Sequence, residues 1–266
     1  MSLRINQNVD AFNAYRNLSV TQGQMSKSLE KLSSGYRINR AADDASGLAI
    51  SEGLRSQVGG LKVAVRNAQD GISVAQTAEG ALTEVHSMLQ RMNDLAVQYA
   101  NGTQGAESQD ALEAEFDALE TEIGRIKDNT TFNGVSLFAG AALTFQVGYS
   151  NGDTIDISAT ALADFSAATD MAAIDIANSD TLRDAINEVS AQRAELGAIQ
   201  NRFEHTINNV NVAVENLSAS ESRIRDTDMA SEMISFTRSQ ILSQAGTAML
   251  AQANQAPQNV LQLLRG

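Results

Sequence analysis

The fold is decided by residues 44–99, which read DASGLAISEGLRSQVGGLKVAVRNAQDGISVAQTAEGALTEVHSMLQRMNDLAVQY. Apolar residues recur here in alternating steps of three and four, apart from one 3-3 step: Leu54, Val58, Leu61, Val65, Ala68, Ile72, Ala75, Ala78, Leu82, Val85, Leu89, Met92, Ala96 and Tyr99. This spacing predicts one helix that shows a narrow apolar seam to its partners. Such a helix would run roughly 80 Å. We therefore predict an elongated bundle rather than a compact globule.

Six glycines interrupt this helix, and each costs about 1 kcal/mol relative to alanine. Their expected use is to let neighbouring backbones approach closely. They are Gly47, Gly53, Gly59, Gly60, Gly71 and Gly80.

The composition favours long helices. The 266 residues suffice for one or two domains, and they include no Cys, no Trp and one Pro, with 5% aromatic residues. The absence of Cys excludes disulfides and thiolate chemistry. So few aromatic residues are not typical of a sandwich, a barrel or an aromatic-lined ligand pocket.

Charge is distributed unevenly along the chain. Residues 1–40 carry six basic and two acidic side chains, and residues 218–266 carry four of each, so the total of −13 leaves −17 for the middle. An acidic body with near-neutral ends argues against nucleic-acid binding. The N-terminus has no apolar signal-peptide core. The sequence also has no run of 18 apolar residues, which a membrane-spanning helix would need. The protein is thus expected to be cytosolic or to leave the cell by another route.

Helical spacing returns in four other places. Residues 5–33 form a heptad pattern that Ser33–Gly35 should stop, residues 112–126 give a short acidic helix after a turn at 101–105, and residues 180–217 and 229–264 give two more helices. Asp43 or Asp44 can cap the long helix, Ser179 or Asp180 the helix from 180, and Asp228 the last one. Pro257 should kink or break that last helix.

A small β element is expected between these helices, at about residues 137–158. Asn133-Gly134 reads as a turn, and alternation at 143–147 and 155–157 predicts a hairpin. A three-residue loop of Ser150, Asn151 and Gly152, with Gly152 left-handed, would pair Val147 with Ile155 and Phe145 with Ile157. Residues 159–180 read as a loop or small excursion.

The chain is therefore mainly α, an antiparallel helical bundle or coiled coil with a small β-hairpin and paired N- and C-terminal helices. We expect an N-terminal helix and linker at 1–43, a central rod at 44–222, and a linker and C-terminal helix at 223–266. The two ends return to the same place and can pair.

The terminal helices carry more apolar side chains than one seam can bury. Beyond the seam lie Ile5, Val9, Phe12, Ile234, Phe236, Ile241, Leu250, Leu261 and Leu264. A two-helix pair is marginal alone, so the ends need neighbours. They could pack on their own central bundle, but the linkers and the length of the central helix argue against this. Copies of the same chain, joined by contacts that do not close into a ring, would form a helical filament. The predicted contact residues are Val9, Phe12, Leu18, Met25, Leu29, Leu32, Ile241, Leu242, Met249, Val260, Leu261 and Leu264.

Nothing in the pattern favours an enzyme, a metal site or a cofactor. His86 and His205 are the only histidines, and neither belongs to a metal-binding motif. The adjacent Asp43 and Asp44 suit a helix cap better than paired catalytic carboxylates. No glycine-rich phosphate loop follows a strand.

Several motifs resemble bacterial flagellin. They are Leu32-Ser33-Ser34-Gly35-Tyr36-Arg37-Ile38-Asn39 with Asp43-Asp44-Ala45-Ser46-Gly47, then Asn67–Ser73, Phe132-Asn133-Gly134, Leu196–Arg202 and the closing run from Gln240 to Leu261. The resemblance covers both ends and most of the middle. With so few residues at 159–180, the chain resembles a minimal flagellin that lacks a variable outer domain.

The resemblance implies a structural subunit of the extracellular flagellar filament, used for swimming motility. In that family the terminal helices form the inner tube and are disordered in the monomer, and the central bundle forms the outer tube. Members are exported unfolded by the flagellar export apparatus. The implied partners are further copies of the chain, an export chaperone on the C-terminal segment, a filament cap protein and a hook–filament junction protein.

The resemblance also points to an innate-immune Toll-like receptor as a partner. The stretch Gln90–Gln98 resembles one that some flagellins present to it, which would make Arg91, Leu95 and Glu115 contact residues; Asn93 departs from the basic residue common there. The other interpretation places Leu95 in the core and Arg91 in a subunit contact. For the chain as a whole, a hook–filament junction protein or a coiled-coil adaptor are the alternatives.

Overall fold

The computed structural model describes residues 7–162 and 176–263, with side chains as far as Gln255. The chain divides into two compact units, which we call the terminal unit (Met1–Ser56 with Leu217–Gly266) and the central unit (Gln57–Asn216). The described residues contain five helices and two small antiparallel sheets. The division falls inside α2 (Ala45–Tyr99) and α5 (Ser179–Arg225), which both units share. The expected domain limits at 43 and 223, which follow the linkers, stay a prediction.

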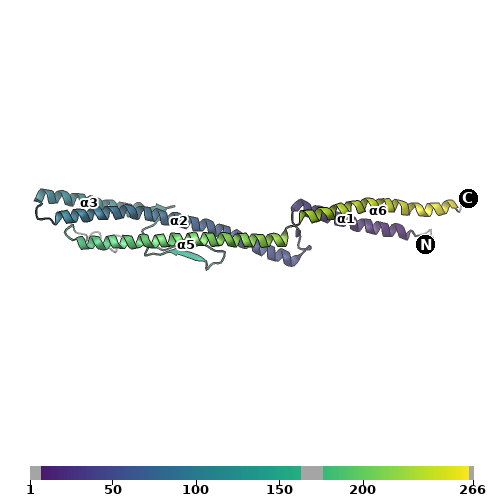
Figure 1. The fold of residues 1–266 in the computed structure, drawn as a ribbon, viewed down its shortest axis with the longest axis horizontal. Helices are drawn as coiled ribbons and strands as arrows, with labels where there is room; N and C mark the ends of the chain where they lie inside the picture. The colour runs from purple at the N-terminus through teal and green to yellow at the C-terminus, as the bar shows by residue number, and fades with distance from the viewer. Residues whose placement is uncertain (1–6, 163–175, 264–266) are drawn as a thin grey trace. The chain divides into compact units, whose positions relative to one another are not determined.

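In the terminal unit, α1 (Val9–Ser34) and α6 (Met229–Leu263) lie side by side and antiparallel (Figure 1). Helix α1 begins at Val9 rather than at the predicted residue 5, because the Asn8 side chain accepts the Ala11 N–H at 3.0 Å and caps the helix. Gly35 ends it as predicted, with a left-handed φ of 77°. Asp228 caps α6 as predicted, since its carboxylate accepts the Ala230 N–H at 2.9 Å.

The two linkers of the terminal unit meet in an antiparallel bridge between Tyr36 and Asp226. The Arg37 N–H donates to the Arg225 carbonyl at 2.7 Å, and the Thr227 N–H donates to the Gly35 carbonyl at 3.0 Å. These bonds join the chain just after α1 to the chain just before α6, and they satisfy backbone groups that the linkers would otherwise leave unpaired.

The neighbouring carboxylates Asp43 and Asp44 have separate tasks at the start of α2. Asp44 caps the helix by accepting the Gly47 N–H at 2.8 Å. Asp43 instead accepts the N–H groups of Arg40 and Asn39. These bonds, that from Arg40 first, lower the pKa of Asp43. The sequence left open whether Asp43 or Asp44 caps α2, and the structure shows that Asp44 does.

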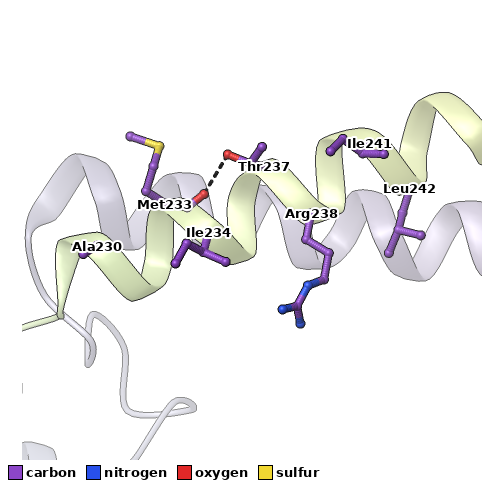
Figure 2. Close-up of a pocket in the computed structure, with 7 residues that line it drawn as sticks. All are labelled: Ala230, Met233, Ile234, Thr237, Arg238, Ile241 and Leu242. Carbon is purple, nitrogen blue, oxygen red and sulfur yellow. Dashed lines mark hydrogen bonds between the residues drawn. The ribbon is translucent and has the colours of Figure 1, made fainter.

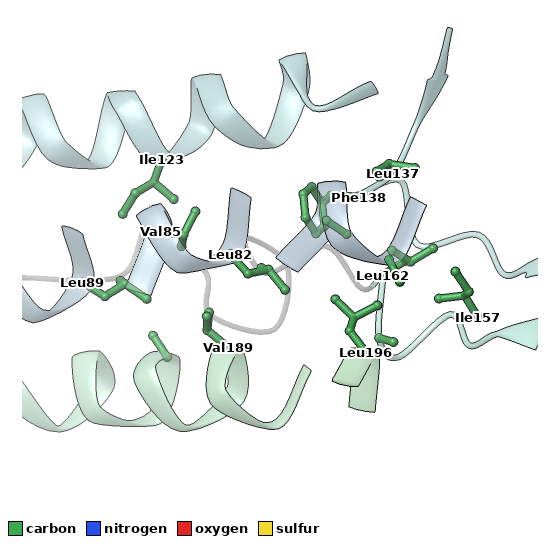
Figure 3. Close-up of a cluster of buried hydrophobic side chains, with 14 of the residues drawn as sticks. Leu82, Val85, Leu89, Ile123, Leu137, Phe138, Ile157, Leu162, Val189 and Leu196 are labelled. Atoms are coloured by element: carbon green, nitrogen blue, oxygen red, sulfur yellow. The ribbon is translucent and has the colours of Figure 1, made fainter. Parts of the chain in front are cut away.

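In the central unit, α2 packs against both α3 (Ala106–Asn129) and α5. Figure 3 shows Leu82, Val85 and Leu89 of α2 between Ile123 of α3 and Val189 of α5. With two partners, α2 buries a wider face than the predicted narrow seam. The wider face adds Ala64, Val74 and Leu95, whereas Val65 and Ile72 of the seam are only partly buried.

A first hairpin forms where the sequence predicted only a turn. Strands β1 (Thr131–Phe132) and β2 (Val135–Ser136) pair across Asn133 and Gly134, whose φ values are 49° and 80°. Two positive φ angles are typical of a tight primed turn. The strands are too short to show alternation in the sequence, which is why the pattern did not predict them.

The predicted second hairpin is present, but its register was wrong by two residues. Strands β3 (Leu143–Gln146) and β4 (Thr154–Ile157) pair Phe145 with Ile155 and Leu143 with Ile157. The shift is even, so each side chain keeps its predicted face. The hairpin packs on the helices through a perpendicular contact between the rings of Phe145 and Phe203, with centroids 5.6 Å apart.

The turn of this hairpin is longer than the predicted loop of Ser150, Asn151 and Gly152. The Val147 N–H still donates to the Asp153 carbonyl at 2.9 Å, and the Gln146 amide donates to the Gly148 and Ser150 carbonyls. These bonds hold a five-residue loop at 148–152, in which Gly152 does not adopt a left-handed φ.

Two other details of the helix ends differ from expectation. Helix α5 is capped by Asn178, whose side-chain oxygen accepts the Asp180 N–H at 3.2 Å, rather than by Ser179 or Asp180. Helix α6 does not break at Pro257 but continues to Leu263; a proline removes a single helical hydrogen bond, and here only the last turns follow it. Of the segment 159–180, residues 163–175 lie outside the described residues, while Leu162 and Ile176 are buried in the core.

Candidate assembly interface

The pair of α1 and α6 buries very little of its own surface. Among the described side chains of the two helices, Leu18, Ser28 and Ser239 are the only buried ones. Leu18 packs against Gly246 of α6, where a β-carbon would lie 3.3 Å from the Leu18 Cδ1 atom. Most apolar side chains of the pair therefore remain in contact with solvent.

Polar contacts fix the antiparallel alignment of α1 and α6. The Asn8 amide donates to the Ala253 carbonyl at 2.7 Å, and the Lys31 ammonium lies 3.8 Å from the Glu232 carboxylate. Both contacts lie near the ends of the pair, so they orient the helices without adding apolar burial.

The predicted contact residues divide into two groups. Leu18 is buried, and Met25 and Leu32 are partly buried. The other described members are exposed large apolar side chains: Val9, Phe12, Leu29, Ile241, Leu242 and Met249. Val260 and Leu261 lie in α6 beyond the described side chains, and Leu264 lies outside the described residues.

The structure adds exposed apolar residues that the predicted set did not include. They are Tyr15 and Val20 on α1, and Met229, Met233 and Ile234 on α6. The sequence already placed Ile234 outside a single seam. The same pattern identifies the other residues, because apolar residues that recur all around a helix need more than one partner. By contrast Phe236 and Leu250 are partly buried within the pair.

The exposed side of α6 forms a shallow groove with an almost wholly apolar lining. It is lined by Ala230, Met233, Ile234, Thr237, Arg238, Ile241 and Leu242 (Figure 2). The Thr237 hydroxyl donates to the Met233 carbonyl at 2.9 Å, so the one small polar group of the lining is already paired. Contiguous exposed apolar surface is typical of sites that bind another protein, a membrane or a ligand.

The residues proposed for receptor contact differ in exposure. Arg91 on α2 and Glu115 on α3 form an ion pair of 2.7 Å, and both side chains are about half exposed. Leu95 is 0% exposed and belongs to the core. A buried side chain cannot touch a partner directly, so its assignment as a contact residue is wrong, and the structure supports the core interpretation for Leu95.

The described part of the chain holds no cluster of three metal-ligating side chains. His86 is hydrogen-bonded to Gln90 one turn along α2, at 2.9 Å. None of the described helices is both long enough and apolar enough to cross a bilayer.

Comparison with known proteins identifies the family. The model of the bacterial flagellin N-terminal helical region matches residues 5–142, and that of the C-terminal helical region matches residues 179–264. The chain belongs to the bacterial flagellin family. A flagellin of Halalkalibacterium halodurans is 56% identical, over 98% of this chain and 99% of the relative. The flagellin of Bacillus subtilis is 48% identical, over 99% of this chain and 100% of the relative.

This flagellin is a structural subunit of the flagellar filament, the assembly that serves motility, and the comparisons do not favour a hook–filament junction protein. A flagellar filament 33 kDa core protein of Treponema phagedenis is 47% identical, over 98% of this chain and 99% of the relative. The 266-residue chain has no room for a large variable domain, as the resemblance implied.

Proposed function

We propose that the exposed apolar faces of α1 and α6 are the contacts through which copies of this flagellin stack into the filament. The observation that supports this proposal is that the helix pair exposes far more apolar side chains than it buries. Leu18 is its one buried apolar residue among those described, whereas Phe12, Ile234 and Ile241 are each at least 60% exposed. At about 25 cal/mol per Å² of apolar area removed from water, covering such residues favours association.

The same imbalance supports the domain arrangement expected from the sequence. Residues 1–43 and 223–266 would form the inner part of the filament, and residues 44–222 the outer part. The central unit has its own apolar core, in which Leu82, Phe138 and Phe203 are fully buried. A unit with a complete core folds alone, whereas the marginal helix pair orders on assembly. In this proposal each added subunit contacts the previous one head-to-tail, and these contacts do not close into a ring.

The further partners follow the family resemblance. The subunit leaves the cell unfolded through the flagellar export apparatus and acts outside it. A chaperone covers the C-terminal segment before export. A cap protein lies at one end of the filament and a junction protein at the other. The apolar groove of α6 supports the chaperone's role, because this surface would otherwise be exposed in the cytoplasm. Contact with a Toll-like receptor would use Arg91 and Glu115 but not Leu95.

Truncation after Asn254 tests the proposal most directly. We expect the truncated chain to keep its central unit folded by circular dichroism and to form no filaments in electron micrographs. Filaments of normal length and number from this variant would refute the role of the terminal helices.

A substitution in the groove tests the surface itself. Ile234→Asp places a charge at a side chain that is 61% exposed, so it leaves the folded subunit unchanged but opposes burial against a neighbour. Ile234→Leu, which keeps the apolar area, is the matched control. We expect the Asp variant not to elongate filament seeds and the Leu variant to do so. Equal elongation by both would contradict the proposal.

A further inference from the structure

Six of the eight methionines lie in the part of the chain that the structure describes, and they differ in exposure. Those on α6 are exposed: Met229 by 49%, Met233 by 52% and Met249 by 61%. Met92 is fully buried, and Met25 and Met88 are partly buried. Within residues 7–162 and 176–255, the three exposed thioethers are thus gathered on one helix of the terminal unit.

Met233 lies in surroundings where a change from an apolar to a polar side chain would matter. It lines the apolar groove beside Ile234 and Ile241, and the hydroxyl proton of Thr237 is used in a bond to the Met233 carbonyl. Figure 2 shows its thioether and the Arg238 guanidinium on opposite sides of α6. An added oxygen on Met233 would therefore place a polar group in a lining that is almost wholly apolar.

We propose that Met233, with Met229 and Met249, forms a peroxide-sensitive modification site that controls whether an unassembled subunit can join the filament. The inference rests on the proposed function, because it requires that the exposed surfaces of α6 that carry these three residues be covered on assembly. In the free subunit the three thioethers are open to oxidants, and in the filament they are enclosed.

The modification is a two-electron oxidation. A sulfur lone pair attacks one oxygen of hydrogen peroxide, the S–O bond forms and the O–O bond breaks. The departing hydroxide takes up the proton released from the transferred oxygen and leaves as water, so the sulfur is oxidised to the sulfoxide and the peroxide is reduced. The product replaces a flexible apolar group by a polar one, which opposes burial in an apolar contact.

The test uses the full-length unassembled subunit. It is treated with dilute hydrogen peroxide, sulfoxide is located by peptide mass spectrometry, and elongation of filament seeds is followed by light scattering. We expect sulfoxide at Met229, Met233 and Met249 but not at Met92, with unchanged helix content. The subunit concentration needed for elongation should rise roughly tenfold, as expected for an unpaired polar group placed in an apolar contact. Methionine sulfoxide reductase should restore the original value.

A resistant variant provides the control. The triple change Met229→Leu, Met233→Leu and Met249→Leu conserves volume, and after peroxide treatment it should elongate seeds as well as before. In assembled filaments of the natural chain, the same three residues should oxidise more slowly than in the free subunit. Restoration by the reductase needs no variant, so it decides the matter even if the triple variant assembles poorly.

Several results would overturn the inference. It fails if subunits with sulfoxide at all three positions elongate normally, if peroxide inhibits the triple variant equally, or if the reductase restores nothing. Failure of the proposed function looks different, because Ile234→Asp, which contains the natural methionines, would then elongate seeds without any peroxide treatment.

Discussion

Gly71 of α2 faces the ring of Phe203 of α5 so closely that a β-carbon at position 71 would lie 2.6 Å from the ring's Cζ atom. Phe203 is fully buried and also contacts the ring of Phe145 from the hairpin. The glycine therefore lets one large side chain join both helices to the hairpin. Of the six glycines in α2, Gly47, Gly60 and Gly71 have such neighbours, whereas Gly53, Gly59 and Gly80 face open space, so close approach explains only half of them.

The first prediction is that Gly71→Ala destabilises the central unit. The added methyl group must displace a ring that is held on two sides, and overpacking of this kind costs about 1–3 kcal/mol. Gly80→Ala on the same helix meets nothing within 4 Å and should instead stabilise by about 1 kcal/mol through helix propensity. Denaturant unfolding followed by circular dichroism measures both. A stabilised Gly71→Ala variant would show that Phe203 can move aside.

The second prediction separates Leu95 from its exposed neighbour. Leu95→Ala leaves a cavity in the core and should lower the free energy of unfolding by about 2–5 kcal/mol. Val97 is 59% exposed, so Val97→Ala should change it by about 0.5 kcal/mol or less. Chemical denaturation of the two variants decides this. Any loss of receptor binding by Leu95→Ala would then reflect packing, and equal stability of both variants would contradict the buried placement.

The third prediction concerns Arg225, where the two linkers meet. Its guanidinium lies 4.9 Å from the centroid of the Tyr36 ring and is paired with Glu52, and its side chain is only 13% exposed. Arg225→Ala removes both contacts, so amide exchange at Arg37 should become roughly tenfold faster, corresponding to about 1.4 kcal/mol. Arg125→Ala, which breaks the exposed pair with Glu122, should leave that rate unchanged. Unaltered exchange in Arg225→Ala would mean that the backbone bridge holds the linkers without it.

The fourth prediction is a pH dependence from Glu188 on α5. Burial raises its pKa above the ordinary value. The folded state then holds its proton to higher pH than the unfolded state, so this residue lowers stability as pH rises above about 4. Glu188→Gln should therefore stabilise the chain at pH 7 and make no difference at pH 3.

Glu122 provides a comparison of opposite sign. The hydrogen bond from Arg125 lowers the pKa of Glu122, so this carboxylate favours the folded state at neutral pH and loses that effect as the pH falls through its folded pKa. Glu122→Gln should not stabilise at pH 7. Thermal unfolding at the two pH values measures both variants, and a Glu188→Gln variant that is less stable than the natural chain at pH 7 would contradict the assignment.

Much of the helical framework was predictable from the sequence. The three-and-four spacing of residues 54–99 predicted α2, Gly35 predicted the end of α1, and Asp228 predicted the start of α6. These features are local, because helical periodicity and caps depend on residues within a turn or two of each other. The surplus of apolar residues at the ends was also readable, and it predicted exposed side chains such as Phe12 and Ile241.

The tertiary structure decided what depends on partners distant in the chain. It placed Leu95 in the core, because α2 packs against two helices and buries a wider face than one seam. It set the hairpin register two residues from the predicted one, because Gln146 and Val147 hold a longer turn. It also assigned Gly71 to the ring of Phe203, 132 positions away in the printed sequence. Local patterns determine which segments become helices, whereas the identity of each buried contact follows only from how those helices are packed together.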